Sequence, residues 1–162
     1  MSLFGRRAIE RTRNGAYRVR LSREERTLLR MLHAELGSLL DDPDDPDLRR
    51  VFPPASDDPE RDAEYRGLVR GQLVDGRTRA LATLEATLDA DTLTAAEADA
   101  WLRVLNDLRL ILGTRLDVTE ETMFSALDPN DPKAHELAVY GYLSWLQEQL
   151  IAALASDVGA SG

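Results

Sequence analysis

Hydrophobic residues recur along most of this chain with the three- and four-residue spacing of helices that bury one side. The repeat predicts four helices, at about residues 23–40, 59–88, 94–116 and 131–155. A short helical turn is also expected between Thr119 and Leu127. In the third helix the apolar positions cover more than half of the circumference, which is typical of a helix packed on several sides.

Local signals mark where these helices begin. Two segments carry a capping box, in which a Ser or Thr N-cap and a Glu three residues later bond to each other's backbone amides. These boxes are Ser22 with Glu25 and Thr94 with Glu97. The other two helices open on Asp-Pro, at Pro59 and Pro132, and proline suits the first helical position because no amide donor is needed there.

Residues 8–21 show a different pattern and are predicted to form a β-hairpin. Asn14-Gly15 is a turn signal, because both residue types tolerate a positive φ. After the turn, apolar and cationic residues alternate as in a strand with one buried and one solvent face. The apolar positions are Tyr17, Val19 and Leu21, and the cationic ones are Arg18 and Arg20.

These elements predict a mainly α fold, namely a single-domain helical bundle of four to five helices with a short N-terminal β-hairpin. A chain of 162 residues with 43% hydrophobic residues can bury roughly 70% of its unfolded surface in one core. The domain is expected to span 1–155, to include an acidic Asp/Pro loop at 41–58, and to be followed by a flexible tail at 156–162.

Charge is unevenly distributed along this framework. The first thirty residues hold nine arginines against three glutamates, a balance of +6 in a chain whose net charge is −9. Such an arm either pairs with the chain's own acidic segment at 41–64 or contacts an external polyanion or acidic protein. A two-stranded ribbon fits a DNA major groove, and arginine binds phosphates and guanine edges. The candidate nucleic-acid or partner-binding residues are Arg6, Arg7, Arg11, Arg13, Arg18 and Arg20.

Polar residues also interrupt the apolar third helix. Arg103 and Asp107 stand four residues apart and are expected to form an ion pair along one face. Because buried polar groups commonly satisfy one another, we predict a structural network rather than a ligand groove. Its expected members are Arg103, Asp107, Arg109 and Arg115.

Signatures of catalysis are missing from the sequence. It contains no P-loop, G-x-G-x-x-G, H-E-x-x-H or G-x-S-x-G motif, no cysteine and only two histidines. We therefore expect a non-enzymatic protein with no catalytic residue, no cofactor and no metal site. The basic start lacks the apolar stretch of a secretory signal, and no run approaches the ~20 apolar residues of a membrane span. A cytoplasmic protein with no membrane partner is expected.

Three segments of the chain resemble one actinobacterial family. They are residues 101–121 (WLRVLNDLRLILGTRLDVTEE), residues 51–55 (VFPPA) and residues 62–66 (DAEYR). The family is that of the oxidative-stress transcriptional regulator AosR, formerly described as a domain of unknown function. Its members often lie beside the gene for the Clp protease adaptor, and some are named aerial mycelium formation protein.

The resemblance implies a role in transcriptional regulation. It also implies a cysteine pair that closes on oxidation, a switch this cysteine-free chain cannot operate. We therefore expect a regulator that acts through the basic hairpin on DNA, or on sigma factor or RNA polymerase. The alternative is a protein-interaction module that binds Clp protease components and no nucleic acid. Whether the chain forms a homodimer stays open.

Overall fold

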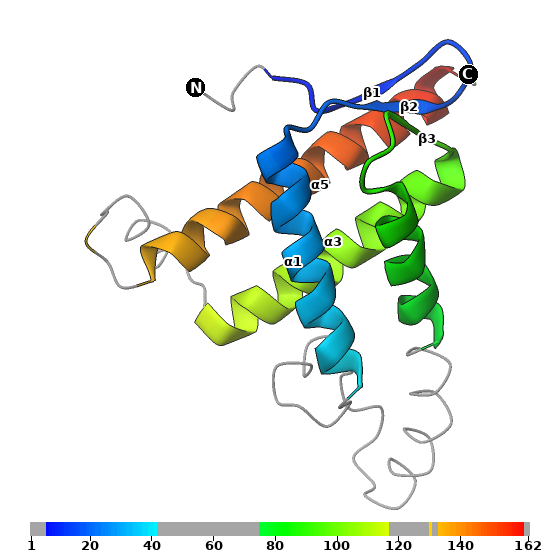
Figure 1. Ribbon diagram of the computed structural model, residues 1–162. Coiled ribbons are helices and arrows are strands. Elements are labelled where there is room, and N and C mark those ends of the chain that lie inside the picture. The colour runs from blue at the N-terminus through cyan, green and yellow to red at the C-terminus, as the bar shows by residue number, and fades with distance from the viewer. Residues whose placement is uncertain (1–5, 42–74, 117–129, 131–132, 161–162) are drawn as a thin grey trace, which may run out of the picture.

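The structure is a computed structural model that describes residues 6–41, 75–116, 130 and 133–160. Within these ranges it has four helices and one small antiparallel sheet, so the expected mainly α fold with an N-terminal hairpin is confirmed. The sheet lies across one end of the helical body (Figure 1). The sheet and all four helices contribute to one cluster of buried apolar residues.

The hairpin consists of β1 (Ile9–Arg11) and β2 (Tyr17–Val19), with Ile9 opposite Val19. Its loop is closed by two bonds, from the Thr12 amide to the Ala16 carbonyl at 2.7 Å and from the Gly15 amide to the Thr12 carbonyl at 3.2 Å. Gly15 has a φ of +80°, which glycine adopts without steric cost. This is the three-residue loop in which a type I turn is followed by a left-handed residue. The predicted turn at Asn14-Gly15 is thus confirmed.

A third strand, which the sequence pattern did not predict, extends this hairpin. β3 (Thr92–Leu93) pairs antiparallel with β2 and places Leu93 opposite Tyr17. Both side chains are essentially fully buried. Two residues are too few to show an alternating pattern, so only the pairing with β2 reveals this strand.

Helix α1 (Arg23–Leu40) begins as its sequence predicts. The Ser22 hydroxyl accepts a hydrogen bond from the Glu25 amide, and the Glu25 carboxylate accepts one from the Ser22 amide, both at 3.1 Å. The buried face follows the helical repeat: Leu29, Leu32, Leu36 and Leu40.

A second helical segment, residues 75–87, runs antiparallel to α1 (Figure 1). Arg26 of α1 donates to the carbonyls of Leu88 and Ala90, at 2.6 and 3.0 Å, just beyond the end of this segment. His33 Nε2 lies 3.0 Å from the Leu81 carbonyl oxygen. These contacts hold the two helices side by side along most of the described length of the segment.

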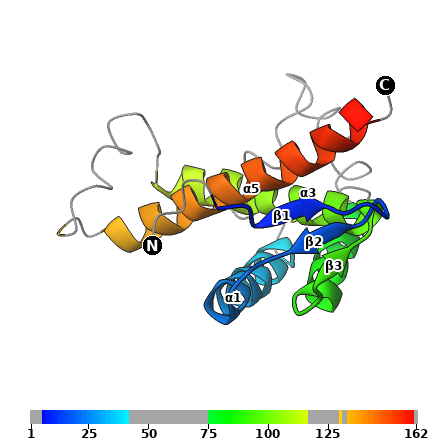
Figure 2. The same cartoon turned by 90° about the horizontal axis from the view of Figure 1, so that it is seen from above.

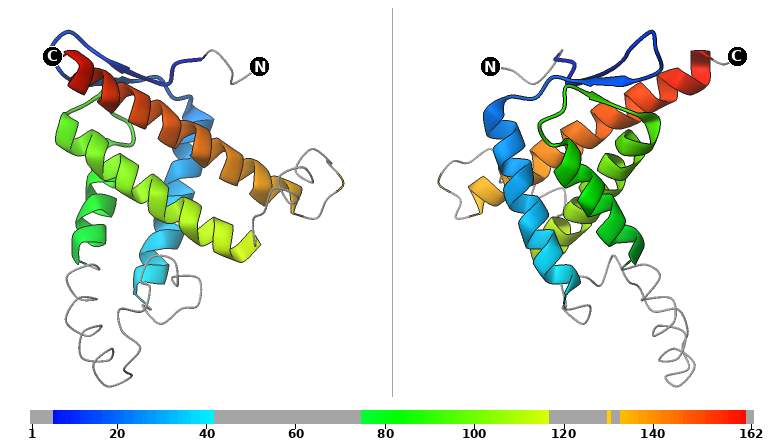
Figure 3. Two further views of the ribbon diagram at one scale, coloured as in Figure 1. Left: turned by 180° about the vertical axis from the view of Figure 1, so that it is seen from behind. Right: turned by 45° about the vertical axis from the view of Figure 1, so that its right-hand side comes forward.

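The other layer is formed by α3 (Ala95–Leu116) and α5 (Ala134–Ala160). These two helices run antiparallel and cross over the first pair, and α5 also packs along β1 (Figures 2 and 3). Trp101 of α3 is fully buried, and its indole Nε1 donates to the Thr87 hydroxyl at 2.7 Å. Buried residues lie on several sides of α3, as the sequence predicted for this helix.

Some predicted boundaries differ from the structure or lie beyond it. Helix α5 continues to Ala160, into the segment expected to form the tail after residue 155. The first part of the helix predicted from Pro59, the turn between Thr119 and Leu127, and nearly all of the loop at 41–58 lie outside the described residues.

Candidate nucleic-acid interface

The hairpin arginines divide into those used by the fold and those left at its surface. Arg6, at the base of the hairpin, belongs to the first group. One of its terminal nitrogens lies 2.7 Å from both the Arg20 carbonyl oxygen and the Glu25 carboxylate. Its guanidinium also lies over the Trp145 ring, 5.4 Å from the centroid, in a cation–π arrangement.

Glu25 is the centre of this contact. Besides Arg6 it accepts a hydrogen bond of 2.7 Å from the Tyr142 hydroxyl of α5 and one from the Ser22 amide. Burial acts to raise the pKa of the Glu25 carboxyl, but these bonds and the Arg6 charge outweigh it, so the pKa lies below its ordinary value. Burial and the neighbouring carboxylate raise the pKa of Tyr142 well above its ordinary value. The cluster therefore joins the base of the hairpin to both α1 and α5.

A second contact holds β1 on α5. The Ala8 amide donates to the Gln149 side-chain oxygen at 3.0 Å. Together with the Glu25 cluster, this bond fixes the hairpin from its base, so the loop at the other end has a defined position.

Arg7, Arg13 and Arg18 form the second group. All three are exposed, and within the described residues none of their guanidinium groups makes an ion pair or hydrogen bond. The alternation of β2 explains Arg18, because Tyr17 and Val19 on either side of it point into the core. Arg13 lies in the hairpin loop, where no neighbouring strand covers it.

The two remaining candidate arginines, Arg20 and Arg11, are exposed but also interact within the molecule. Arg20 is paired with Glu10 of β1 at 3.3 Å, but its side chain remains 54% exposed. Such a pair is weak because water screens it. Arg11 is exposed as well, although it has an interaction of its own within the molecule.

The tip of the hairpin forms a shallow hollow of about 470 Å³. In the described part of the chain its lining contains three arginines and one carboxylate: Glu10, Arg11, Thr12, Arg13, Asn14 and Arg18. This described lining therefore has a charge balance of +2 in an acidic molecule, and the asparagine and threonine add uncharged hydrogen-bonding groups. Groups of this kind bind phosphate oxygens.

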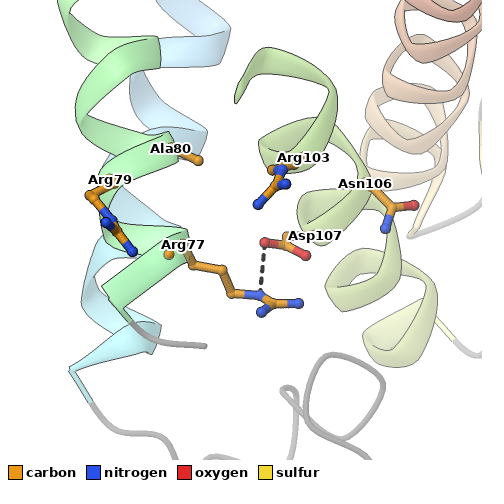
Figure 4. Close-up of a pocket in the computed structure, with 7 residues that line it drawn as sticks. Arg77, Arg79, Ala80, Arg103, Asn106 and Asp107 are labelled. Atoms are coloured by element: carbon orange, nitrogen blue, oxygen red, sulfur yellow. Dashed lines mark ion pairs between the residues drawn. The ribbon is translucent and has the colours of Figure 1, made fainter. Parts of the chain in front are cut away.

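The predicted polar network of the third helix is arranged differently from the expected Arg103–Asp107 pair. Asp107 is buried and instead pairs with Arg77 of the neighbouring helical segment, with Nε and Oδ2 3.0 Å apart (Figure 4). Arg103 pairs with Asp99, one turn earlier in α3, at 3.3 Å. The expected pair was wrong because a buried carboxylate gains more from a partner that is itself shielded from water. Burial raises the pKa of Asp107, and the charge of Arg77 offsets this only in part.

Arg109 belongs to a separate set of bonds between α3 and α5. It donates to the Gln147 side-chain oxygen at 2.5 Å, and the Gln147 nitrogen donates to Asn106 at 3.3 Å. Its guanidinium also lies 5.8 Å from the centroid of the Tyr140 ring. Arg115, the fourth expected member, is exposed in the last turn of α3 and has an interaction of its own within the molecule. The printed bonds of Asp107 and those of Arg109 belong to two separate sets.

Sequence reasoning missed several partners in these clusters, namely Arg77, Tyr142, Gln147 and Gln149. Only one signal pointed to any of them. A carboxylate on an apolar helix needs a cation, which indicated that Asp107 would be paired without indicating by which residue. The others depend on how α5 lies against the rest of the molecule.

Neither a metal-binding cluster nor a membrane-spanning helix occurs in the described part of the chain. No group of three or more His, Cys, Asp or Glu side chains there is placed to hold a metal ion. No helix in that part is long and apolar enough to cross a membrane.

The fold and this surface together define a mainly α protein that presents cationic side chains on a hairpin at one end. Over residues 6–154 the chain matches the family described as a domain of unknown function, DUF2017, and it belongs to that family.

Relatives with a functional name cover most of the chain. The oxidative stress regulator AosR of Mycobacterium tuberculosis (strain H37Rv) is 30% identical over 185 residues, which cover 88% of this chain and 84% of the relative. The protein of the same name from Mycobacterium bovis gives the same values. A Mycobacterium leprae relative that also carries the AosR name is 32% identical over 130 residues, or 69% of this chain and 59% of that protein. The resemblance to the AosR family is thereby confirmed, and no solved structure matches the chain.

Proposed function

We propose that this protein is a non-enzymatic regulator that binds DNA through the hollow at the hairpin tip. The names of its relatives support a regulatory role. The observation that carries the DNA-binding proposal is the exposure of Arg13 and Arg18 in a hollow whose described lining has a charge balance of +2. These guanidinium groups have no partner among the described residues, so they are available to phosphates.

The shape of the hairpin supports the same proposal. A two-stranded ribbon is narrow enough for a major groove, and here its base is fixed to α1 and α5 by the Arg6–Glu25 contact. A fixed base lowers the conformational cost of binding, because little of the ribbon has to be ordered on contact. The strongly acidic composition of the rest of the chain disfavours non-specific contact through other surfaces.

Regulation in this chain requires an input other than thiol oxidation, because it has no cysteine. The DNA-binding surface would then respond to a bound ligand or to a protein partner.

The proposal is tested by fluorescence anisotropy with labelled duplex fragments of the source genome at low salt. We expect the double variant Arg13→Gln, Arg18→Gln to bind roughly tenfold or more weakly than the unmodified protein, because two phosphate contacts are lost. A matched control, Arg79→Gln with Arg103→Gln, removes the same charge from another part of the surface and should retain affinity. If the unmodified protein does not bind any fragment at low salt, the proposal is wrong.

The same variants address the alternative of a Clp-dependent interaction module. Affinity purification from the native cell would then recover Clp subunits with the unmodified protein, and the hairpin variant would lose them. That result, together with no DNA binding, would replace the regulator proposal with the alternative.

A further inference from the structure

A second arginine-lined hollow lies between α3 and the helical segment 75–87, away from the hairpin. Its volume is about 480 Å³, within the range of small-molecule sites. The described residues that line it are Gly76, Arg77, Arg79, Ala80, Arg103, Asn106 and Asp107. Three of them are cationic and one is anionic.

Asp107 organises the inner part of this hollow. Its side chain is only 7% exposed, and its Oδ2 lies 3.0 Å from Arg77 Nε. Arg77 and Arg103 reach toward Asp107 from the two different helices (Figure 4). Arg103 also acts electrostatically on the Asp107 carboxyl, where its charge lowers the pKa. Asp107 thus holds Arg77 through an ion pair, while Arg103 reaches toward it from α3 and is paired with Asp99.

The outer part of the hollow retains hydrogen-bonding capacity. Arg79 uses Nε for a long bond of 3.4 Å to the Asp75 carbonyl, and Arg103 uses Nε for the exposed pair with Asp99. In the described part of the chain the terminal nitrogens of both side chains have no bond. The Arg103–Asp99 pair is more than half exposed on both sides, so solvent screens it and a ligand competes with it readily.

The chemistry of the lining restricts the ligand. Apart from Gly76 and Ala80, every lining residue in the described part of the chain is charged or polar, and none of these is aromatic. This described lining offers no stacking platform for a nucleobase and little apolar contact. Arginine forks match the oxygens of a phosphate group, and a phosphate dianion neutralises the two positive charges by which the described lining exceeds its one carboxylate once the exposed Arg103–Asp99 pair opens.

We propose that this hollow, which we call the interhelical pocket, binds the phosphate group of a small polar molecule. Arg79 and Arg103 bind the phosphate oxygens directly. Arg77 is held by Asp107 in the inner part of the pocket and attracts the phosphate electrostatically. The inference adds a ligand site to the regulator proposed above but does not require DNA binding. The pocket joins α3 to the helix that leads into β3, so a bound ligand would contact the two helices that flank the third strand.

The test is isothermal titration calorimetry of the full chain with inorganic phosphate and with ribose 5-phosphate, at constant ionic strength maintained with sodium chloride. We expect saturable binding, and a melting temperature that rises with phosphate concentration because the ligand binds the folded state. The double variant Arg79→Gln, Arg103→Gln should bind at least about tenfold more weakly, since two charged hydrogen-bonding groups are removed. Its melting temperature in chloride alone reports whether it is folded.

The control is Arg7→Gln with Arg23→Gln, two exposed arginines that line neither of the two hollows, so this variant removes two charges and leaves the pocket intact. It should bind phosphate like the unmodified protein. Equal loss in this variant and in Arg79→Gln, Arg103→Gln would assign phosphate binding to general charge and overturn the pocket proposal, as would the absence of binding beyond that of chloride. Because DNA affinity is measured separately with the hairpin variant Arg13→Gln, Arg18→Gln, failure of the pocket and failure of the DNA surface give different results.

Discussion

Arg26 and Arg13 have the same side chain and lie in the same basic arm, but the structure places them in opposite environments. Arg26 donates to carbonyls of Leu21, Leu88 and Ala90 and so joins α1 to the end of the neighbouring helical segment. Arg13 lies in the hairpin loop, with no bond from its guanidinium among the described residues. The arginines of the first thirty residues therefore have two roles. Some of them connect elements of the fold, and others are available to an outside ligand.

The largest effect on stability is expected in the core, which supports the elements that carry both groups of arginines. Trp101→Ala should lower the free energy of unfolding by roughly 3–5 kcal/mol, because a fully buried indole leaves a cavity. Its hydrogen bond to Thr87 is lost as well. Urea unfolding followed by circular dichroism measures the change. A loss below about 1 kcal/mol would show that this tryptophan does not fill the core in solution.

Arg26→Ala tests the group of arginines that connects the fold. We expect a loss of about 2 kcal/mol, because carbonyls that receive charged hydrogen bonds are left without them. Arg23→Ala is the matched control, one turn earlier in α1, and its side chain is exposed. It should change stability by less than about 0.5 kcal/mol. Equal losses in the two variants would remove the distinction between connecting and exposed arginines.

The Glu25 cluster, which binds the connecting arginine Arg6, should make the stability of the protein depend on pH. The folded-state pKa of Glu25 is lowered, so its contribution to stability is fully present above the ordinary value of 4.5 and disappears as the pH falls through the lower folded value. Glu25→Gln should therefore cost about 1–2 kcal/mol at pH 7 and progressively less below pH 4.5. Chemical unfolding across this pH range measures both proteins. A difference that stays constant or grows toward acid pH would contradict the role assigned to the carboxylate.

The smallest effect on stability is expected at the hairpin tip. Arg13→Gln with Arg18→Gln should change the free energy of unfolding by less than about 0.5 kcal/mol, because neither guanidinium has a described partner. Thermal unfolding by calorimetry detects any larger change. A loss comparable to that of Arg26→Ala would place these two side chains among the arginines that the fold uses.

The sequence was informative wherever a feature depends on neighbouring residues. The capping boxes at Ser22 and Thr94 and the turn at Gly15 were predicted correctly, because each is set by local backbone chemistry. The strand at Thr92–Leu93 was not predicted, since it exists only through pairing with β2.

The candidate site was predicted less well, for the same reason. A run of arginines can be counted in the sequence, but the capture of Arg6 by Glu25 and Trp145 depends on how α1 and α5 meet. The partner of Asp107 comes from another helix, so spacing within α3 suggested the wrong arginine. Long-range packing thus decides which charged residues are exposed.

The central claim is that Arg13 and Arg18 are available to an outside polyanion, and the salt dependence of DNA binding tests it most directly. The slope of log K against log salt should be shallower by about 0.9 for each phosphate contact that is lost, so by about 1.8 in the double variant Arg13→Gln, Arg18→Gln. The Arg79→Gln, Arg103→Gln protein should keep the slope of the unmodified chain. An identical slope in all three proteins would contradict the claim.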